Sequence, residues 1–173
     1  AVVLGHSMGG KAAMALALSA PERLAGLIVA DIAPVAYTQS HAGYLDAMRG
    51  VELGALRRRG DADPMLAGAV PEPGLRAFLL QNLRFEEGRA RWRINLDALG
   101  AGMTGLLGFP EDLPRARHDG PALFLHGGAS AYVAAETHPA IRARFPAAEI
   151  EAIPGAGHWL HAEAPEAFVA AVS

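Results

Sequence analysis

Residues 1–11, AVVLGHSMGGK, decide the fold expected for this chain of 173 residues. Residues 2–4 form a short apolar run typical of a buried strand, and residues 5–9 are a G-x-S-x-G pentapeptide centred on Ser7. The Ala-rich stretch 10–20 then favours a helix. A strand, a sharp glycine turn and a helix, with serine at the apex, are the context of a nucleophile elbow.

Two glycines flank this serine for a steric reason. We expect side chains at Gly5 and Gly9 to collide with the neighbouring strand and helix, because the turn brings these elements close together. The N–H groups at the start of the helix favour negative charge near the serine oxygen. The alternative is that Ser7 only caps the helix, a role that needs no glycine at position 9. Lys11, the only lysine, is expected to be solvated and without a catalytic role.

The composition is that of a globular protein and excludes several kinds of site. Hydrophobic residues make up 51% and charged residues 19% of the chain. The net charge of −3 gives no case for nucleic acid or an anionic membrane as a partner, and residues 57–59 (RRR) are expected to form one exposed helical turn. No apolar stretch approaches the roughly 18–20 residues that span a bilayer. The absence of cysteine excludes disulfides, thiolate metal ligands and cysteine nucleophiles.

Further apolar runs predict a sheet that continues beyond the first strand. Residues 24–31 (LAGLIVAD) predict a buried parallel strand that ends at Asp31. The alternation of strands and helices predicts an α/β fold with a parallel sheet, in which ligands gather at the carboxyl ends of the strands. Asp31 is therefore a candidate for the site, with a turn or N-cap aspartate as the alternative. The other predicted core elements are strands at 121–126 and 148–153 and helices at 139–145 and from 165 onward.

The middle of the chain has a different pattern. Tyr44, Leu45 and Met48 recur at helical spacing, and no convincing strand is found between the two parts of the sheet. Such an insertion is most simply a helical cap over the strand ends. The expected organisation is an α/β core at 1–40, a helical cap at 41–114 and a return to the core at 115–173. Within the cap, helices are expected at 75–83 and 94–99, with loops at 60–64 and 69–74.

A serine hydroxyl needs a general base, and the base needs an orienting carboxylate. Of the seven histidines, His158 is the candidate base because it lies in a glycine loop after the last predicted strand. It also follows Ser7 and Asp31 in the order serine, acid, histidine. His161 is the alternative. Three roles are expected for the remaining histidines. His6 is next to the serine in sequence, but its side chain is expected to point elsewhere and pack. His126 ends a strand without a flexible loop, and the others (His41, His118 and His138) are expected to be solvated.

Five motifs cover the whole chain in order. They are GHSMGGK at 5–11, DIAP at 31–34, YLDAMR at 44–49, GGASAYV at 127–133 and GHWLHAEAPE at 157–166. Together they resemble the YbfF-type esterases, which are small α/β hydrolases with a helical cap. The resemblance implies an α/β-hydrolase fold, of which this chain holds the C-terminal part of the parallel sheet with the cap insertion. We expect the chain to be an N-terminally truncated piece of a longer protein.

The resemblance also assigns the acid. In α/β hydrolases generally the acid follows the strand after the cap, but residues 127–133 contain no Asp or Glu, and the nearest acid, Glu136, is displaced. The resembled family instead uses the aspartate after the earlier strand, and Asp31 matches it. The implied catalytic residues are therefore Ser7, Asp31 and His158. The implied oxyanion hole consists of the Met8 N–H and a second donor upstream of residue 1.

The activity implied is that of a serine hydrolase cleaving short- or medium-chain carboxylic esters through an acyl-enzyme. The partner is a small-molecule acyl ester, and no cofactor or metal is expected. On the same triad, a thioesterase, a perhydrolase or a carbon–carbon bond hydrolase is an alternative. A haloalkane dehalogenase is disfavoured, since its nucleophile is an aspartate where Ser7 stands. From another class of function, a catalytically silent binding module is the alternative. Cytoplasm is the default location.

Overall fold

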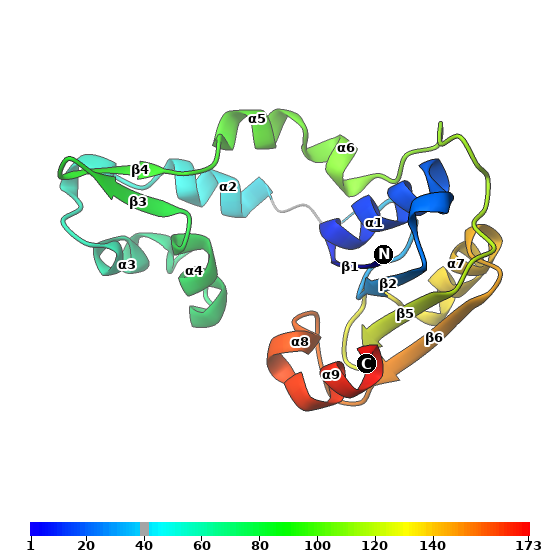
Figure 1. The fold of residues 1–173 in the computed structure, drawn as a ribbon. Coiled ribbons are helices and arrows are strands. Elements are labelled where there is room, and N and C mark those ends of the chain that lie inside the picture. Colours follow the sequence, from blue (N-terminus) through cyan, green and yellow to red (C-terminus); the bar gives the residue numbers. More distant parts are fainter. Residues whose placement is uncertain (39–41) are drawn as a thin grey trace. The chain divides into compact units, whose positions relative to one another are not determined.

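The computed structural model describes residues 1–38 and 42–173. His41, the first residue of the predicted cap and one of the candidate histidines, lies outside the described residues. The chain divides into two compact units, the first made of residues 1–36 and 108–173 and the second of residues 37–107 (Figure 1). None of the described helices is long and apolar enough to cross a membrane.

The first unit is built on a sheet of four strands in the order β1-β2-β5-β6 (Figure 1). All three pairings are parallel, so every strand ends at the same edge of the sheet. The predicted α/β fold with a parallel sheet is confirmed. The strands are β1 (Val2–His6), β2 (Gly26–Ala30), β5 (Ala122–Gly127) and β6 (Ala148–Ile153).

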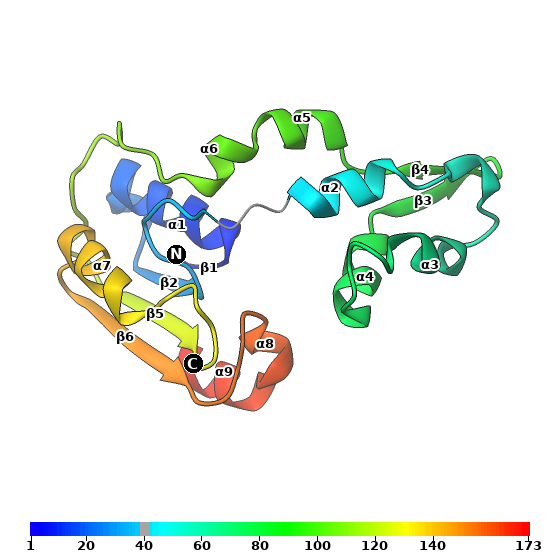
Figure 2. The same ribbon diagram turned by 180° about the vertical axis from the view of Figure 1, so that it is seen from behind.

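Helices cover both faces of this sheet (Figure 2). Val29 and Phe124 are neighbours on one face of the sheet. Helix α1 approaches this face at Val29. Phe145, which directly follows α7, packs on the same face with its ring centroid 5.3 Å from that of Phe124. On the other face Leu125 belongs to a buried cluster with Leu160 of α8, against which α9 also packs. The four helices are α1 (Met8–Ser19), α7 (His138–Arg144), α8 (Leu160–Glu163) and α9 (Pro165–Val172).

Two polar side chains of this unit are buried although the sequence predicted them to be solvated. Lys11 is only 8% exposed, and its Nζ donates a hydrogen bond to the carbonyl of Gly108 at 2.6 Å. Desolvation by this burial lowers the pKa of Lys11. His118 is buried beside the ring of Phe145, and its backbone N–H donates to the carbonyl of Arg144. Both predictions were wrong because these contacts join distant parts of the chain.

The second unit contains a β-hairpin that the sequence did not predict. β3 pairs with β4 in antiparallel register, with Glu86 opposite Arg89. Glu87 and Gly88 connect them, and both have positive φ, 50° and 75°, as a two-residue hairpin turn of right-handed twist requires. The alternation of Leu83 and Phe85 with charged residues is the strand signal that was missed. The elements of this unit are α2 (Ala42–Arg49), α3 (Asp63–Leu66), α4 (Pro73–Leu80), β3 (Leu83–Glu86), β4 (Arg89–Trp92), α5 (Leu96–Ala101) and α6 (Met103–Leu107).

Two other predictions for this segment differ from the structure. The three arginines at 57–59 do not form a helical turn: the carboxylate of Asp61 accepts the backbone N–H groups of Arg57 and Arg58, which lowers the pKa of Asp61. Asp63 begins α3 inside the stretch predicted as a loop. At the arginines the contact with the Asp61 side chain sets the conformation. At α3 a proline in the first helical turn, Pro64, favours the helix.

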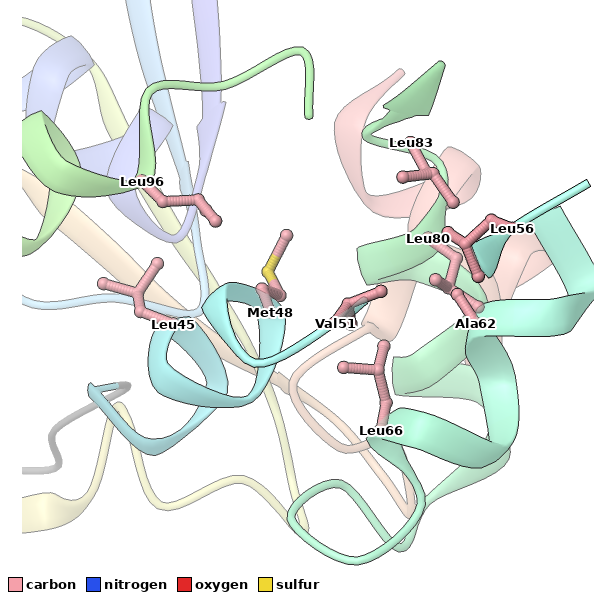
Figure 3. Packing of buried hydrophobic residues seen from close by; sticks show 9 residues of the cluster. All are labelled: Leu45, Met48, Val51, Leu56, Ala62, Leu66, Leu80, Leu83 and Leu96. Atoms are coloured by element: carbon pink, nitrogen blue, oxygen red, sulfur yellow. The ribbon is translucent and has the colours of Figure 1, made fainter. Parts of the chain in front are cut away.

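The second unit has its own apolar core (Figure 3). Met48 lies inside it, and its carbonyl accepts a hydrogen bond from the indole N–H of Trp92 at 3.0 Å, which ties the hairpin to α2. The core therefore joins helices and hairpin in one unit. Its buried members are Leu45, Met48, Val51, Leu56, Ala62, Leu66, Leu80, Leu83 and Leu96.

We expect Leu66→Ala to destabilise this unit strongly, since Leu66 is fully buried in its core. Removing a buried leucine side chain costs about 2–5 kcal/mol, through lost transfer free energy and the cavity left behind. Met65, the neighbouring residue of α3, is 44% exposed and offers a matched control. Urea unfolding of the intact protein measures both variants. Equal, small effects of Leu66→Ala and Met65→Ala would contradict the assigned core.

Candidate active site

Ser7 lies at the sharp turn between β1 and α1. Its φ of 54° and ψ of −123° are strained for a residue with a side chain. Backbone hydrogen bonds hold this conformation: the Ser7 N–H donates to the carbonyl of Ala30, and the Ser7 carbonyl accepts the N–H of Gly10. Ser7 occupies the N-cap position, but its side chain makes no capping hydrogen bond. The hydroxyl is therefore directed elsewhere.

The steric requirement for glycine holds at one of the two predicted positions. A Cβ on Gly5 would lie 2.2 Å from the carbonyl oxygen of Gly9, so Gly5 is required. A Cβ on Gly9 would meet nothing within 4 Å in the described part of the chain, so that prediction was wrong. The second crowded position is Gly10, whose Cβ would lie 2.5 Å from the side chain of Ile32. Gly10 allows α1 to pack close to the end of β2.

The structure brings Ser7, His158 and Asp31 together in one line of hydrogen bonds. His158 Nε2 is 3.1 Å from Ser7 Oγ, and His158 Nδ1 is 2.7 Å from Asp31 Oδ2. Because a carboxylate only accepts, Nδ1 carries the proton and Nε2 is left to accept from the serine hydroxyl. Ser7 follows β1, Asp31 follows β2 and His158 lies in the loop after β6, so all three meet at the carboxyl edge of the sheet.

Asp31 is completely buried, and its carboxylate is fully engaged. Besides His158, it accepts the backbone N–H of Gly127 at 3.1 Å on Oδ1 and the hydroxyl of Ser130 on Oδ2. Its φ of 52° is a second strained position. A buried carboxylate needs such partners, since it loses its hydration. The arrangement orients one carboxylate oxygen toward the imidazole.

The sequence did not single out two residues that contact this line. Ser130 donates to Asp31, and Tyr132 stacks on the imidazole of His158 with ring centroids 4.1 Å apart. Both come from the GGASAYV stretch after β5, which contains no Asp or Glu. The hydroxyl of Ser130, in a stretch where an acid would be usual, could have indicated a contact with the candidate acid.

The other candidates take different positions. Glu136, the alternative acid, is exposed in a 3-10 turn at 135–137, whereas Asp31 contacts the imidazole. His161, the alternative base, is exposed, with its ring 4.7 Å from that of His6. His126 contacts the carbonyl of Gly127 through Nδ1. No group of three or more metal-ligating side chains among residues 1–38 and 42–173 is arranged to hold a metal ion.

Met8, whose N–H was predicted to bind the oxyanion, is the first residue of α1. N–H groups in the first turn of a helix have no partner within the helix and favour a nearby negative charge. This place beside Ser7 suits the proposed role, which stays a prediction, as does the second donor.

A model of the alpha/beta hydrolase family matches residues 1–171. This chain belongs to the alpha/beta hydrolase family. The predicted resemblance to the YbfF-type esterases is confirmed, because the chain is 38% identical to "Esterase YbfF" of Escherichia coli (strain K12) over 173 residues, covering 99% of this chain and 65% of that protein. It is 44% identical over 178 residues to "sn-1-specific diacylglycerol lipase ABHD11" of Mus musculus, covering 99% of this chain and 57% of that protein.

A solved structure titled "Marine microorganism esterase" is similar to this alpha/beta hydrolase over nearly its whole length. It has a TM-score of 0.94 and 35% identity, with 99% of this chain and 68% of that chain covered. The chain spans between about half and two thirds of the length of these two curated relatives.

Proposed function

We propose that the protein is a serine hydrolase that cleaves carboxylic esters of short or medium acyl chain through an acyl-enzyme. The observation that carries the proposal is the hydrogen-bonded line from Ser7 Oγ through His158 to the buried Asp31. The names of relatives support it, since the mouse protein is called a lipase and the E. coli protein an esterase. A small-molecule acyl ester as substrate and a cytoplasmic location stay predictions.

In the proposed reaction, the Ser7 hydroxyl attacks the ester carbonyl carbon while His158 Nε2 takes its proton. Asp31 holds the imidazole by its Nδ1–H and stabilises the positive charge that forms on it. The Met8 N–H stabilises the negative oxygen of the tetrahedral intermediate. His158 then gives its proton to the leaving alcohol, and the acyl group stays on Ser7. Water then gives a proton to the same imidazole and attacks the acyl carbon; the bond to Ser7 Oγ breaks, the carboxylic acid leaves and His158 returns the proton to the serine.

The surroundings of His158 suit this alternation of charge. The stacked ring of Tyr132 presents a π face to the imidazole, and a π face attracts a cation. The carboxylate of Asp31 is shielded from water, so its attraction for the imidazolium is less screened than at the surface. Both contacts lie beside the imidazole on which the transition state places positive charge.

Hydrolysis of a p-nitrophenyl ester series from acetate to octanoate by the intact protein tests the proposal. We expect saturable hydrolysis that depends on Ser7, with the best chain length within the series. An acyl-thioester substrate, run in parallel, distinguishes a thioesterase. Absence of both activities in the wild-type protein would reject the proposed hydrolase and favour the binding module.

We expect Gly127→Ala to lower kcat/KM for the best ester by about 100-fold, the loss that a 1 Å displacement of catalytic groups produces. A Cβ at this position would lie 2.2 Å from the carbonyl oxygen of Gly157 and 2.4 Å from that of Ala156, so the loop carrying His158 must move. The same change disturbs the N–H that Asp31 accepts. Gly54→Ala is the control, because a Cβ there meets nothing within 4 Å in the described residues. Wild-type kcat/KM in Gly127→Ala would contradict this close approach.

A further inference from the structure

His6 contacts the histidine of the candidate triad through the backbone. Its Nε2 lies 2.8 Å from the carbonyl oxygen of His158. A carbonyl oxygen only accepts, so Nε2 of His6 carries the proton and donates. His6 is the last residue of β1 and directly precedes Ser7. One side-chain hydrogen bond therefore joins the strand that carries the serine to the loop that carries the imidazole.

This hydrogen bond complements the others that hold the loop. The carboxylate of Glu163 accepts the N–H of Gly157 at 2.6 Å and that of Trp159 at 3.0 Å, on either side of His158. These two bonds fix the residues flanking His158. The bond from His6 fixes the peptide carbonyl of His158 itself.

The ring of His6 also packs among the rings of this loop. Its centroid is 4.7 Å from that of His158, 5.5 Å from that of Trp159 and 4.7 Å from that of His161. The imidazole of His158 thus has His6 on one side and the stacked Tyr132 as a further neighbour. The packing of these rings and the hydrogen bond from His6 therefore both restrict the position of the His158 imidazole.

The charge state of His6 fits this position. Desolvation by burial lowers the pKa of His6, and proximity to His158 and His161 lowers it further, while the bond to the His158 carbonyl and the charge of Asp31 raise it. The net direction is downward. A neutral His6 avoids placing a second positive charge beside the imidazolium that forms on His158.

We propose that His6 is a positioning residue for the reaction: its Nε2–H holds the carbonyl of His158 and so keeps the imidazole aligned between Ser7 and Asp31. This inference rests on the proposed function, because His6 acts through His158 and does not touch the reacting atoms. It goes beyond the prediction that the side chain of His6 only packs, because Nε2 also contacts the carbonyl of His158.

Two substitutions separate the hydrogen bond from the packing. His6→Leu fills similar space without a donor, whereas His6→Gln keeps an N–H near the position of Nε2. We expect His6→Leu to lower kcat on the best p-nitrophenyl ester by about 10- to 100-fold with little change in KM, as for misplaced catalytic groups. His6→Gln should restore most of kcat. A loss in His6→Gln equal to that in His6→Leu would overturn the proposal.

A second measurement needs no substrate. The Nδ1–H proton of His158, bonded to Asp31, should give a low-field NMR resonance that is protected from exchange with water. We expect this resonance in the wild-type protein and in His6→Gln, and its loss through faster exchange in His6→Leu. If His6→Leu does not fold, His6→Asn replaces it, because its shorter side chain does not reach the carbonyl.

The two measurements keep the two proposals distinguishable. Wild-type kcat together with an unchanged resonance in His6→Leu would overturn the positioning role while ester hydrolysis stands. If the wild-type protein hydrolyses no ester, the proposed function fails. The resonance alone then decides whether His6 positions His158: its loss in His6→Leu and retention in His6→Gln supports the role, and any other pattern overturns it.

Discussion

Ser7→Ala is expected to lower kcat for ester hydrolysis by a factor on the order of 10⁶, the loss found when the nucleophile of a serine hydrolase is removed. The Ser7 hydroxyl lies 3.1 Å from His158 Nε2, and the substitution removes this hydrogen bond. The backbone bonds of Ser7 to Ala30 and Gly10 remain in the variant, so the turn is retained. Steady-state kinetics on the best p-nitrophenyl ester measures the loss.

The control for this variant is its thermal stability. An unchanged melting temperature shows that the lost activity comes from the hydroxyl and not from unfolding. Ester hydrolysis retained in Ser7→Ala at more than about 1% of wild type would mean that another nucleophile acts, because residual catalysis without the triad lies far below that.

Asp31→Asn is expected to lower kcat by a factor on the order of 10⁴ while leaving the imidazole near its place, since the amide favours the wrong histidine tautomer. Both carboxylate oxygens of Asp31 accept hydrogen bonds. Oδ1 accepts from the Gly127 N–H, and Oδ2 accepts from the Ser130 hydroxyl and His158 Nδ1. An amide nitrogen in either position would face a donor. The kcat of the variant on the best ester gives the measurement.

Asp46→Asn is the matched control, because this exposed aspartate of the second unit pairs only with Arg49 among the described ion pairs. It should retain wild-type kcat. Nearly intact activity in Asp31→Asn would remove Asp31 from the site and direct attention to Glu136.

Local patterns predicted the sheet well. The apolar runs that became β2, β5 and β6 are bounded by turn residues, and the predicted strand at 148–153 has the same bounds as β6. The elbow was predictable too, because strand, glycine turn and helix are all contiguous in the first residues. In each case the determining interactions lie close together in the sequence.

Contacts between distant segments were not predictable from those patterns. Lys11 is buried because Gly108, nearly a hundred residues away, supplies its carbonyl, and Ser130 reaches Asp31 across a similar separation. The role of His6 depends on the backbone of His158, at the other end of the chain. The hairpin of β3 and β4 is not such a distant contact, because its strands are joined directly by the turn at Glu87 and Gly88. The alternation of apolar and charged residues beside this turn is a local pattern from which the hairpin could have been predicted.

The most direct test of the proposed serine hydrolase is covalent labelling of the intact protein with a fluorophosphonate, followed by mass spectrometry of the modified peptide. We expect one adduct, on Ser7, with labelling strongly slowed in His158→Ala because the base that activates the hydroxyl is gone. An unlabelled Ser7, or an adduct on another residue that survives in Ser7→Ala, would contradict it.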